Sequence, residues 1–305
     1  MDKFYSYNPY IDNYDNYLAH YGIKRKSGRY PWGSGKRPHQ HEGSKEIDPY
    51  LAYWALKLGL SLTVTAGIIV ANKISVSNSE KKDQKVCDML NEPHEIDKES
   101  GLPLKNKEYS DKEDLAMVNP AYKAYSEFST HNCANCSITY ELRKKGFDVT
   151  ANLRDYGLTT PTITSMFKDA EAKTIPKPIR TGESYVKKVL DTLSKEPEGS
   201  HGLALVDWMY GGGHAYNYEI KNGKVVFSDP QCNKSGASVR NYLLQVRNGG
   251  FEYVRTDDKT PNFENISKQK VVRDTTKSVE EIVNNDIVND PLLSSKKSKN
   301  KAKGE

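Results

Sequence analysis

Hydrophobic and polar positions follow a regular pattern in one part of the chain, between Leu102 and about Arg255. There, segments with the helical spacing of apolar residues alternate with segments in which every second residue is apolar, as in half-buried strands. The ends of the chain show no sustained pattern, apart from a weak helical repeat near Val279. The pattern predicts a flexible region at 1–48, an apolar helix at 49–72, a linker at 73–101, a folded domain at 102–257 and a disordered basic tail at 258–305.

The longest apolar stretch runs from Tyr50 to Ala71 and contains a single charge, Lys57. Its length suits a membrane span of about 20 residues. Serine, threonine and glycine residues dilute its hydrophobicity, however, and basic residues flank it on both sides, so the positive-inside rule decides little. Two interpretations follow for this helix: contact with a membrane through 50–71, or packing on another protein.

A cysteine-containing segment, residues 132–146, has the pattern of a loop, a helix and a glycine stop. Ile138 and Leu142 form an apolar pair at helical spacing, the last turn is basic, and a glycine commonly ends a helix. Asn135 is a favoured N-cap residue. With this N-cap, Cys136 is expected in the first turn of the helix.

The expected position of Cys136 has a chemical consequence. Free amides and the positive end of the helix dipole favour a thiolate, so a cysteine there ionises below its ordinary pKa of roughly 8.5. Because the thiolate is the nucleophile, Cys136 is the predicted nucleophile and Cys133, expected in the preceding loop, ranks second. Three other interpretations stay open: half of a zinc knuckle, a redox dithiol, or two buried and inert cysteines. Cys87 and Cys232 are isolated and supply no second knuckle.

A histidine follows a glycine run in the second informative region, residues 202–231. A buried strand is expected at 202–209, and Gly211-Gly212-Gly213 leads into His214 at the start of the next strand. Asn222-Gly223 is a strong signal for a two-residue hairpin turn. The return strand then ends at Asp229.

The hairpin turn fixes which residues lie opposite each other. With a two-residue turn Tyr218 faces Phe227, and alternation of side chains places His214 and Asp229 on one face, as diagonal neighbours roughly 7–8 Å apart at the backbone. We therefore predict His214 as base and Asp229 as its orienting acid, with Asn217 on the opposite face. The nucleophile helix is expected to pack against the face of Tyr218 and Phe227. The other candidates for the base are His131 and His201, neither of which has an acid placed beside it in this way. The other candidate for the acid is Asp207.

Composition narrows the partners and the compartment. The chain is 28% charged and 36% hydrophobic, with a net charge of +5 that is concentrated in the tail. Nothing builds a basic groove with interleaved aromatics, so no specific nucleic-acid partner is expected. Four cysteines are too few for a disulfide scaffold, and the first 30 residues lack the apolar core of a secretory signal. We expect a reducing compartment and neither a metal nor a cofactor.

Several blocks of the chain resemble a known family. They are residues 115–120, 132–149, 213–217 and 226–231. In content and order they are similar to the papain-fold toxin domains, papain-like deamidases or peptidases that occur in phage structural proteins and polymorphic toxins. The resemblance covers about half the chain, and its specific parts are the cysteine block and the Gly-His-Ala block. Phe147 and Ser228 depart mildly from the family pattern.

The resemblance implies an α+β papain-like fold, in which the helix with the nucleophile packs on an antiparallel sheet, and a triad of Cys136, His214 and Asp229. It implies attack on an amide through a thioester, with a peptide bond or a glutamine side chain of a host or phage protein as substrate. Cleavage, deamidation and cross-linking stay open. Asn132 and Gln231 are the expected supporting residues, with Asn132 considered for the oxyanion hole.

Residues 20–35 resemble a short N-terminal motif that is common in tailed-phage structural proteins. This resemblance implies virion components as partners, and a location in the phage virion or the host cytoplasm, with membrane association through 50–71 as an addition. The alternative to an enzyme is a non-enzymatic, head-associated phage protein that uses the domain as a scaffold.

Overall fold

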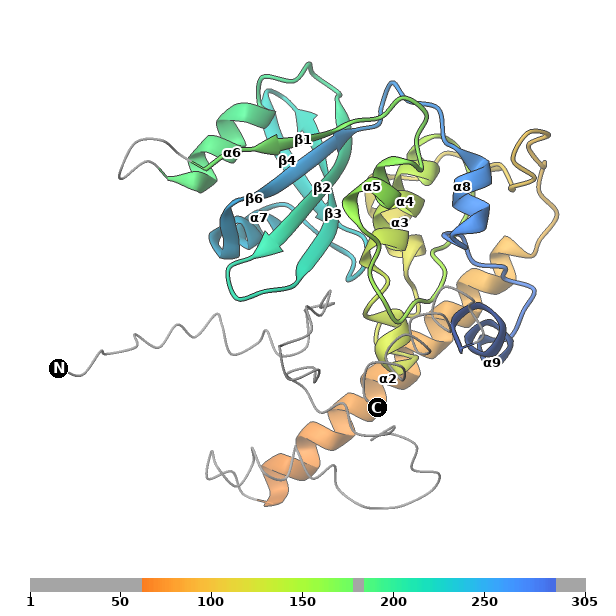
Figure 1. Cartoon of the computed structure of the whole chain (residues 1–305). Helices are drawn as coiled ribbons and strands as arrows, with labels where there is room; N and C mark the ends of the chain where they lie inside the picture. The colour runs from red at the N-terminus through yellow and green to blue at the C-terminus, as the bar shows by residue number, and fades with distance from the viewer. Residues whose placement is uncertain (1–61, 178–183, 289–305) are drawn as a thin grey trace, which may run out of the picture.

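The computed structural model of the chain describes residues 62–177 and 184–288, and Figure 1 shows its architecture. Six strands form one antiparallel sheet in the order β1-β6-β2-β3-β4-β5. Their bounds are β1 Ala172–Ile175, β2 His201–Trp208, β3 Gly213–Lys221, β4 Lys224–Asp229, β5 Lys234–Ser235 and β6 Val246–Arg255. The predicted α+β class with an antiparallel sheet is confirmed.

Helices cover both faces of this sheet (Figure 1). On one side of the sheet lie α3 Asp111–Val118, α4 Cys133–Lys144, α5 Thr160–Thr164 and α8 Phe263–Lys268, and on the same side but further from the sheet lie α2 Leu62–Leu90 and α9 Val279–Ile282. Two short helices complete the order of elements: η1 Ser126–Ser129 precedes α4 in the chain, and η3 Val283–Val288 follows α9. The opposite face carries α6 Tyr185–Leu193 and α7 Ala237–Arg240 (Figure 1), and η2 Asn241–Gln245 packs in the same core through Tyr242 and Leu243.

The central strand β2 is apolar on both sides because both faces of the sheet are covered. Leu203 and Leu205 join the core beneath α4, while Ala204 and Val206 join the core beneath α6 and η2. Each fully buried side chain of this kind contributes about 1.5–3 kcal/mol through removal of apolar area from water. The two cores hold α4 and the sheet in a fixed relation, on which the geometry of the site depends.

The β3–β4 hairpin has the predicted register. Tyr218 lies opposite Phe227, and the turn residues Asn222 and Gly223 have φ angles of 53° and 66°, as a type I′ turn requires. The packing of this hairpin differs from the prediction in one respect: Tyr218 and Phe227 belong to the core beneath α6, whereas α4 packs on the other face, around Ala215. The position of Asn217 on the face opposite His214 is confirmed.

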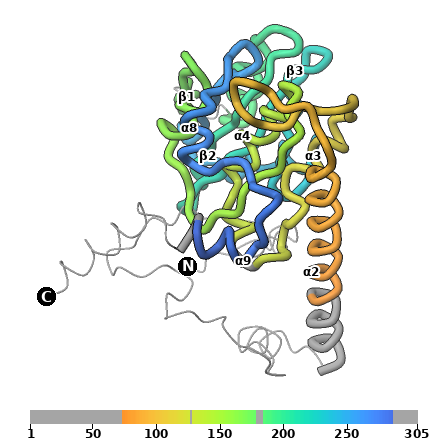
Figure 2. Tube along the Cα trace, turned by 90° about the vertical axis from the view of Figure 1, so that its right-hand side faces the viewer, coloured from red at the N-terminus to blue at the C-terminus, as the bar shows by residue number. Residues whose placement is uncertain are grey.

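Helix α2 occupies the segment predicted as a linker, residues 73–101, as far as Leu90. It runs along one side of the helical half (Figure 2), and its first turns project beyond the domain (Figure 1). Among residues 73–90 of α2, the part whose burial is described, the buried residues are Asp83, Cys87 and Leu90, so the segment has little apolar signal. No described helix combines the length and the apolar character that a membrane span needs. Residues 49–61 of the predicted apolar helix lie outside the described residues.

The domain also extends past its predicted end at 257. Ile266 and Val271 are buried in the core beneath α4, and Ile282 packs in a smaller cluster with Leu153. Arg273 forms an ion pair with Asp83 of α2, with 2.7 Å between Nη1 and Oδ1. Residues 258–288 are thus part of the folded unit rather than a disordered tail. The predicted regions 1–48 and 289–305 lie outside the described residues.

Candidate active site

Helix α4 begins three residues earlier than the sequence pattern predicts. Its N-cap is Asn132, and Cys133 is its first residue. Asn135, the predicted N-cap, lies inside the helix, where its Nδ2 donates to the carbonyl of Asn152 at 3.2 Å. The unpaired amides and positive dipole of a helix start therefore act on Cys133, and Cys136 lies one turn further along.

His214, near the start of β3, and Asp229, the last residue of β4, form a buried pair. The distance from Nε2 of His214 to Oδ2 of Asp229 is 3.0 Å. The other ring nitrogen, Nδ1, makes no full hydrogen bond among the described residues. The thiol of Cys133 lies close enough to the imidazole to add, after the larger effect of Asp229, to the raised pKa of His214. The structure thus brings Cys133, His214 and Asp229 together.

The ionisation of the pair reflects a competition between burial and charge. Burial alone would lower the pKa of His214, but the charge and hydrogen bond of Asp229, with a contribution from Cys133, raise it to about 10. Burial would raise the pKa of Asp229, yet His214, Cys232 and Tyr242 hold it below its ordinary value. The arrangement therefore favours an imidazolium beside a carboxylate.

Cys136 lies in a different environment. Its side chain is buried in an apolar cluster with Leu115, Val118, Tyr140 and Ala151. Burial first, and then its acidic neighbours, raise the pKa of Cys136 well above the ordinary value, which disfavours a thiolate. The predicted helix start just before Cys136 is wrong, because the helix begins at Cys133. The role of Cys136 as nucleophile stays a prediction.

The two predicted supporting residues tie the cysteine loop to the aspartate loop. Gln231 donates from Nε2 to Asn132 Oδ1 at 3.3 Å and to the carbonyl of Thr130 at 3.0 Å. Asn132 Nδ2 in turn donates to the carbonyl of Asn152 at 3.2 Å and to Asn119 Oδ1 at 3.4 Å. Both side-chain amide hydrogens of Asn132 are thus used in hydrogen bonds to other residues of the protein. Asn132 therefore holds the loop in place, and its amide is not directed at a substrate in this conformation.

A buried glutamate fixes the middle of α4 on the sheet. Glu141 accepts hydrogen bonds from Asn217 Nδ2 at 2.8 Å, His201 Nδ1 at 2.7 Å and Thr256 Oγ1 at 2.6 Å. Asn217 also donates to the carbonyl of Ser137 at 3.1 Å. Burial would raise the pKa of Glu141, but the bond and charge of His201, with Thr256, lower it. The rival His201 is thus engaged in anchoring α4.

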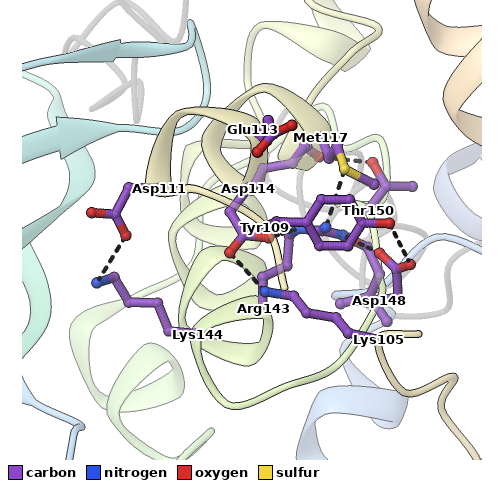
Figure 3. Close-up of polar contacts among 12 residues, drawn as sticks. Lys105, Tyr109, Asp111, Glu113, Asp114, Met117, Arg143, Lys144, Asp148 and Thr150 are labelled. Atoms are coloured by element: carbon purple, nitrogen blue, oxygen red, sulfur yellow. Dashed lines mark hydrogen bonds and ion pairs between the residues drawn. The ribbon is translucent and has the colours of Figure 1, made fainter. Parts of the chain in front are cut away.

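A buried arginine, Arg143, fixes the C-terminal end of α4 (Figure 3). Nε of Arg143 lies 3.0 Å from Asp114 Oδ1, and Nη1 lies 2.8 Å from Asp148 Oδ1. The side chain of Arg143 has no exposed surface. Lys105 adds a second cation to Asp114 at 2.6 Å, and the Tyr109 ring lies over the guanidinium. The cluster locks α3 and α4 to the segment that follows α4.

Aromatic side chains surround the His214 ring. Trp208 stacks on it at 6.1 Å between ring centroids, and Tyr216 and Tyr242 lie at 5.9 Å. Tyr242 and Cys232, which the sequence pattern did not single out, both reach the carboxylate of Asp229. Tyr242 and Cys232 reach Asp229 because η2 and the loop after β4 pack next to it. Hydrophobic periodicity in the sequence does not predict this packing. The rival acid Asp207 pairs with Arg247 at the surface.

The site is closed to solvent in this conformation. The exposed fraction is 0% for Cys133, 4% for His214 and 2% for Asp229. Within the described residues, no group of three or more histidine, cysteine or acidic residues is arranged to hold a metal ion. The chemistry available to the site is proton transfer and nucleophilic attack by a thiolate, with a carboxylate that orients the base.

Comparison with protein families finds a match that covers the site. Residues 131–234, which contain all three residues of the cluster, match the family model described as papain fold toxin 1, glutamine deamidase. Comparison with curated proteins and with solved structures finds no match. The matched residues include α4, the β3–β4 hairpin and the loop that contains Cys232. Over residues 131–234, about a third of its length, the chain is similar to the papain-fold toxin 1, glutamine deamidase family.

Proposed function

We propose that this domain deamidates glutamine side chains of a protein substrate, with Cys133 as nucleophile, His214 as acid and base, and Asp229 as the group that orients His214. The observation that carries the proposal is the position of Cys133 as the first residue of α4, supported by the contribution of Cys133 to the raised pKa of His214. The family match supports deamidation as the reaction.

The chemistry begins with a thiolate–imidazolium pair. The imidazolium of His214 and the dipole of α4 both favour the ionised form of the Cys133 thiol. The thiolate attacks the amide carbon of the glutamine side chain, and the developing oxyanion requires hydrogen-bond donors. The amides of the first turn of α4 point along the helix axis in the direction of this end, which makes them the candidates for that role.

Two proton transfers complete the reaction. The imidazolium gives its proton to the leaving nitrogen, ammonia departs, and a thioester links Cys133 to the substrate. A water molecule then loses a proton to His214 and attacks the thioester, which releases glutamate and restores the thiolate. Asp229 keeps the imidazole in one orientation during both steps and stabilises its cationic form.

A matched pair of variants tests this assignment. Cys133→Ala and Cys136→Ala make the same change one turn apart in α4, at two side chains that are both fully buried. The purified full-length variants and the parent protein are incubated with a bacterial lysate, and peptide mapping by mass spectrometry searches for conversion of glutamine to glutamate. We expect conversion with the parent protein and with Cys136→Ala, and none with Cys133→Ala.

Other outcomes would redirect the proposal. Loss with Cys136→Ala alone would restore Cys136 as nucleophile, and equal loss in both variants with folding intact would indicate a paired thiol. New peptide termini instead of glutamate would indicate a peptidase with the same residues. If the parent protein modifies nothing, the non-enzymatic scaffold remains. The phage and virion context of the motif at 20–35 stays a prediction, since these residues lie outside the described part of the chain.

A further inference from the structure

The carboxylate of Asp229 has more donors than orientation of a histidine requires. Its Oδ2 accepts from His214 Nε2 at 3.0 Å, from the Tyr242 hydroxyl at 3.0 Å and from the Cys232 thiol at 3.3 Å. Its Oδ1 accepts from the backbone amide of Gln231 at 3.1 Å. A carboxylate oxygen offers about two lone-pair sites, so three donors on Oδ2 share the same charge.

The Tyr242 hydroxyl is held in this position by its ring. Tyr242 is 8% exposed and lies in η2, between α7 and β6. Its ring meets Trp208, His214 and Tyr216 in edge-to-face contacts, with centroids 5.7–6.0 Å apart. Burial first, and then the charge of Asp229, raise the pKa of Tyr242 far above its ordinary value, so the hydroxyl keeps its proton and remains a donor.

We propose that Tyr242 is a positioning residue of the site, whose hydroxyl holds the same carboxylate oxygen that His214 uses and limits how tightly Asp229 binds the imidazolium. The inference rests on the proposed function, because His214 needs this restraint only if it must release its proton to a leaving group. An imidazolium that is held too tightly by Asp229 is a poor acid and a poor general base near neutral pH.

The remaining titratable groups around the pair come from several elements. They are Cys133 and Cys136 of α4, Tyr216 of β3, Cys232 after β4 and Tyr242 of η2. Beside these acids lies a cation, Lys234 of β5, which is opposite Asp229 in the sheet and whose charge acts against the effect of burial on the pKa of Cys232. Tyr242 and Cys232 are the members that donate to Asp229, so they are the groups that can weaken its hold on His214.

Tyr242→Phe removes the donor and leaves the ring in place. Without this donor, Oδ2 of Asp229 interacts more strongly with the imidazolium of His214. The ratio of imidazolium to imidazole at a given pH should therefore rise about three- to tenfold. Tyr216→Phe is the matched control. Its ring also lies against His214, and its buried hydroxyl has no hydrogen-bond partner among the described residues. This control should leave the titration unchanged.

The measurement is the NMR titration of the His214 imidazole in the full-length protein, with the signal assigned from its loss in His214→Gln. We expect the midpoint to move to higher pH in Tyr242→Phe, to stay in Tyr216→Phe, and to rise slightly in Cys232→Ala, because a thiol is a weaker donor. Coincident curves for Tyr242→Phe and Tyr216→Phe, or a shift to lower pH, would overturn the proposal.

A second variant and the independence of the titration from the activity assay keep the proposal testable. If Tyr242→Phe does not fold, Cys232→Ala decides, and an unchanged midpoint overturns the proposal. The titration needs no substrate, so it is independent of the deamidation assay. A shifted midpoint in a protein that modifies no glutamine would refute the proposed function alone, whereas an active enzyme with an unshifted midpoint would refute the role of Tyr242 alone.

Discussion

Arg143 provides the sharpest test of how α4 is held. Arg143→Met keeps most of the length of the side chain and removes the guanidinium, which leaves Asp114 and Asp148 in the interior (Figure 3). Removal of one partner of a buried ion pair costs about 3–5 kcal/mol. Lys105 still neutralises Asp114 at 2.6 Å, and His94 lies 3.2 Å from Asp148. We therefore expect a loss near the lower limit, about 3 kcal/mol.

The assay is urea unfolding of the full-length protein, followed by far-UV circular dichroism and by fluorescence so that a two-state transition can be verified. Lys187→Met is the matched control, because Lys187 pairs with Asp191 on the exposed face of α6. An exposed pair at this spacing contributes about 0.3–0.5 kcal/mol. Addition of Asp148→Asn to Arg143→Met should recover part of the loss, since it removes the unpaired buried charge.

Two results would refute this reasoning. If Arg143→Met lowers the free energy of unfolding by less than about 1 kcal/mol, the cluster behaves like a surface pair. If Asp148→Asn adds to the loss instead of reducing it, the contribution of Arg143 comes from packing of its aliphatic part and not from its charge.

Two more predictions concern the His214–Asp229 pair. Asp229→Asn should preserve the fold, as judged by circular dichroism, and lower the rate of glutamine conversion by about 10⁴, because the imidazole loses its orientation; a loss below tenfold would contradict this role. The folded-state pKa of His214, about 10, lies above the ordinary value of 6.5, so its contribution to stability is fully present below pH 6.5 and is lost as the pH rises through about 10. The free energy of unfolding of the parent protein should therefore fall more steeply over this interval than that of Asp229→Asn, and parallel curves from pH-dependent urea unfolding would refute the coupling.

Local signals allowed the hairpin to be predicted correctly. The Asn222-Gly223 turn fixes its own register, since both residues adopt positive φ angles, and the register then brings His214 and Asp229 together. The end of α4 was equally predictable, because Gly146 has a positive φ of 97°. These features depend on residues that are neighbours in sequence or across one turn.

The start of α4 could not be predicted in the same way. Asn132 and Asn135 are both favoured N-cap residues, and neither makes a side-chain bond that would identify it from local sequence. The choice is made by distant partners, chiefly Asn119 and Gln231, which bind Asn132. The boundary errors have a related cause: residues 73–101 and 258–288 bury few apolar side chains, and they join the domain through contacts such as Asp83 with Arg273.

The polar anchors of α4 determine which cysteine faces His214. Cys133 and Cys136 are separated by nearly one helical turn, and a helix held by apolar contacts alone, such as those of Ile138 and Leu142, tolerates small shifts along its axis. Hydrogen bonds are directional, so the bonds of Asn132, Glu141 and Arg143 to separate parts of the fold are satisfied together in one register only. A shift by one turn would leave buried charges unpaired at both Glu141 and Arg143, at a cost of several kcal/mol each. The polar contacts along α4, which lie outside the three reactive residues, therefore place Cys133 rather than Cys136 in the site.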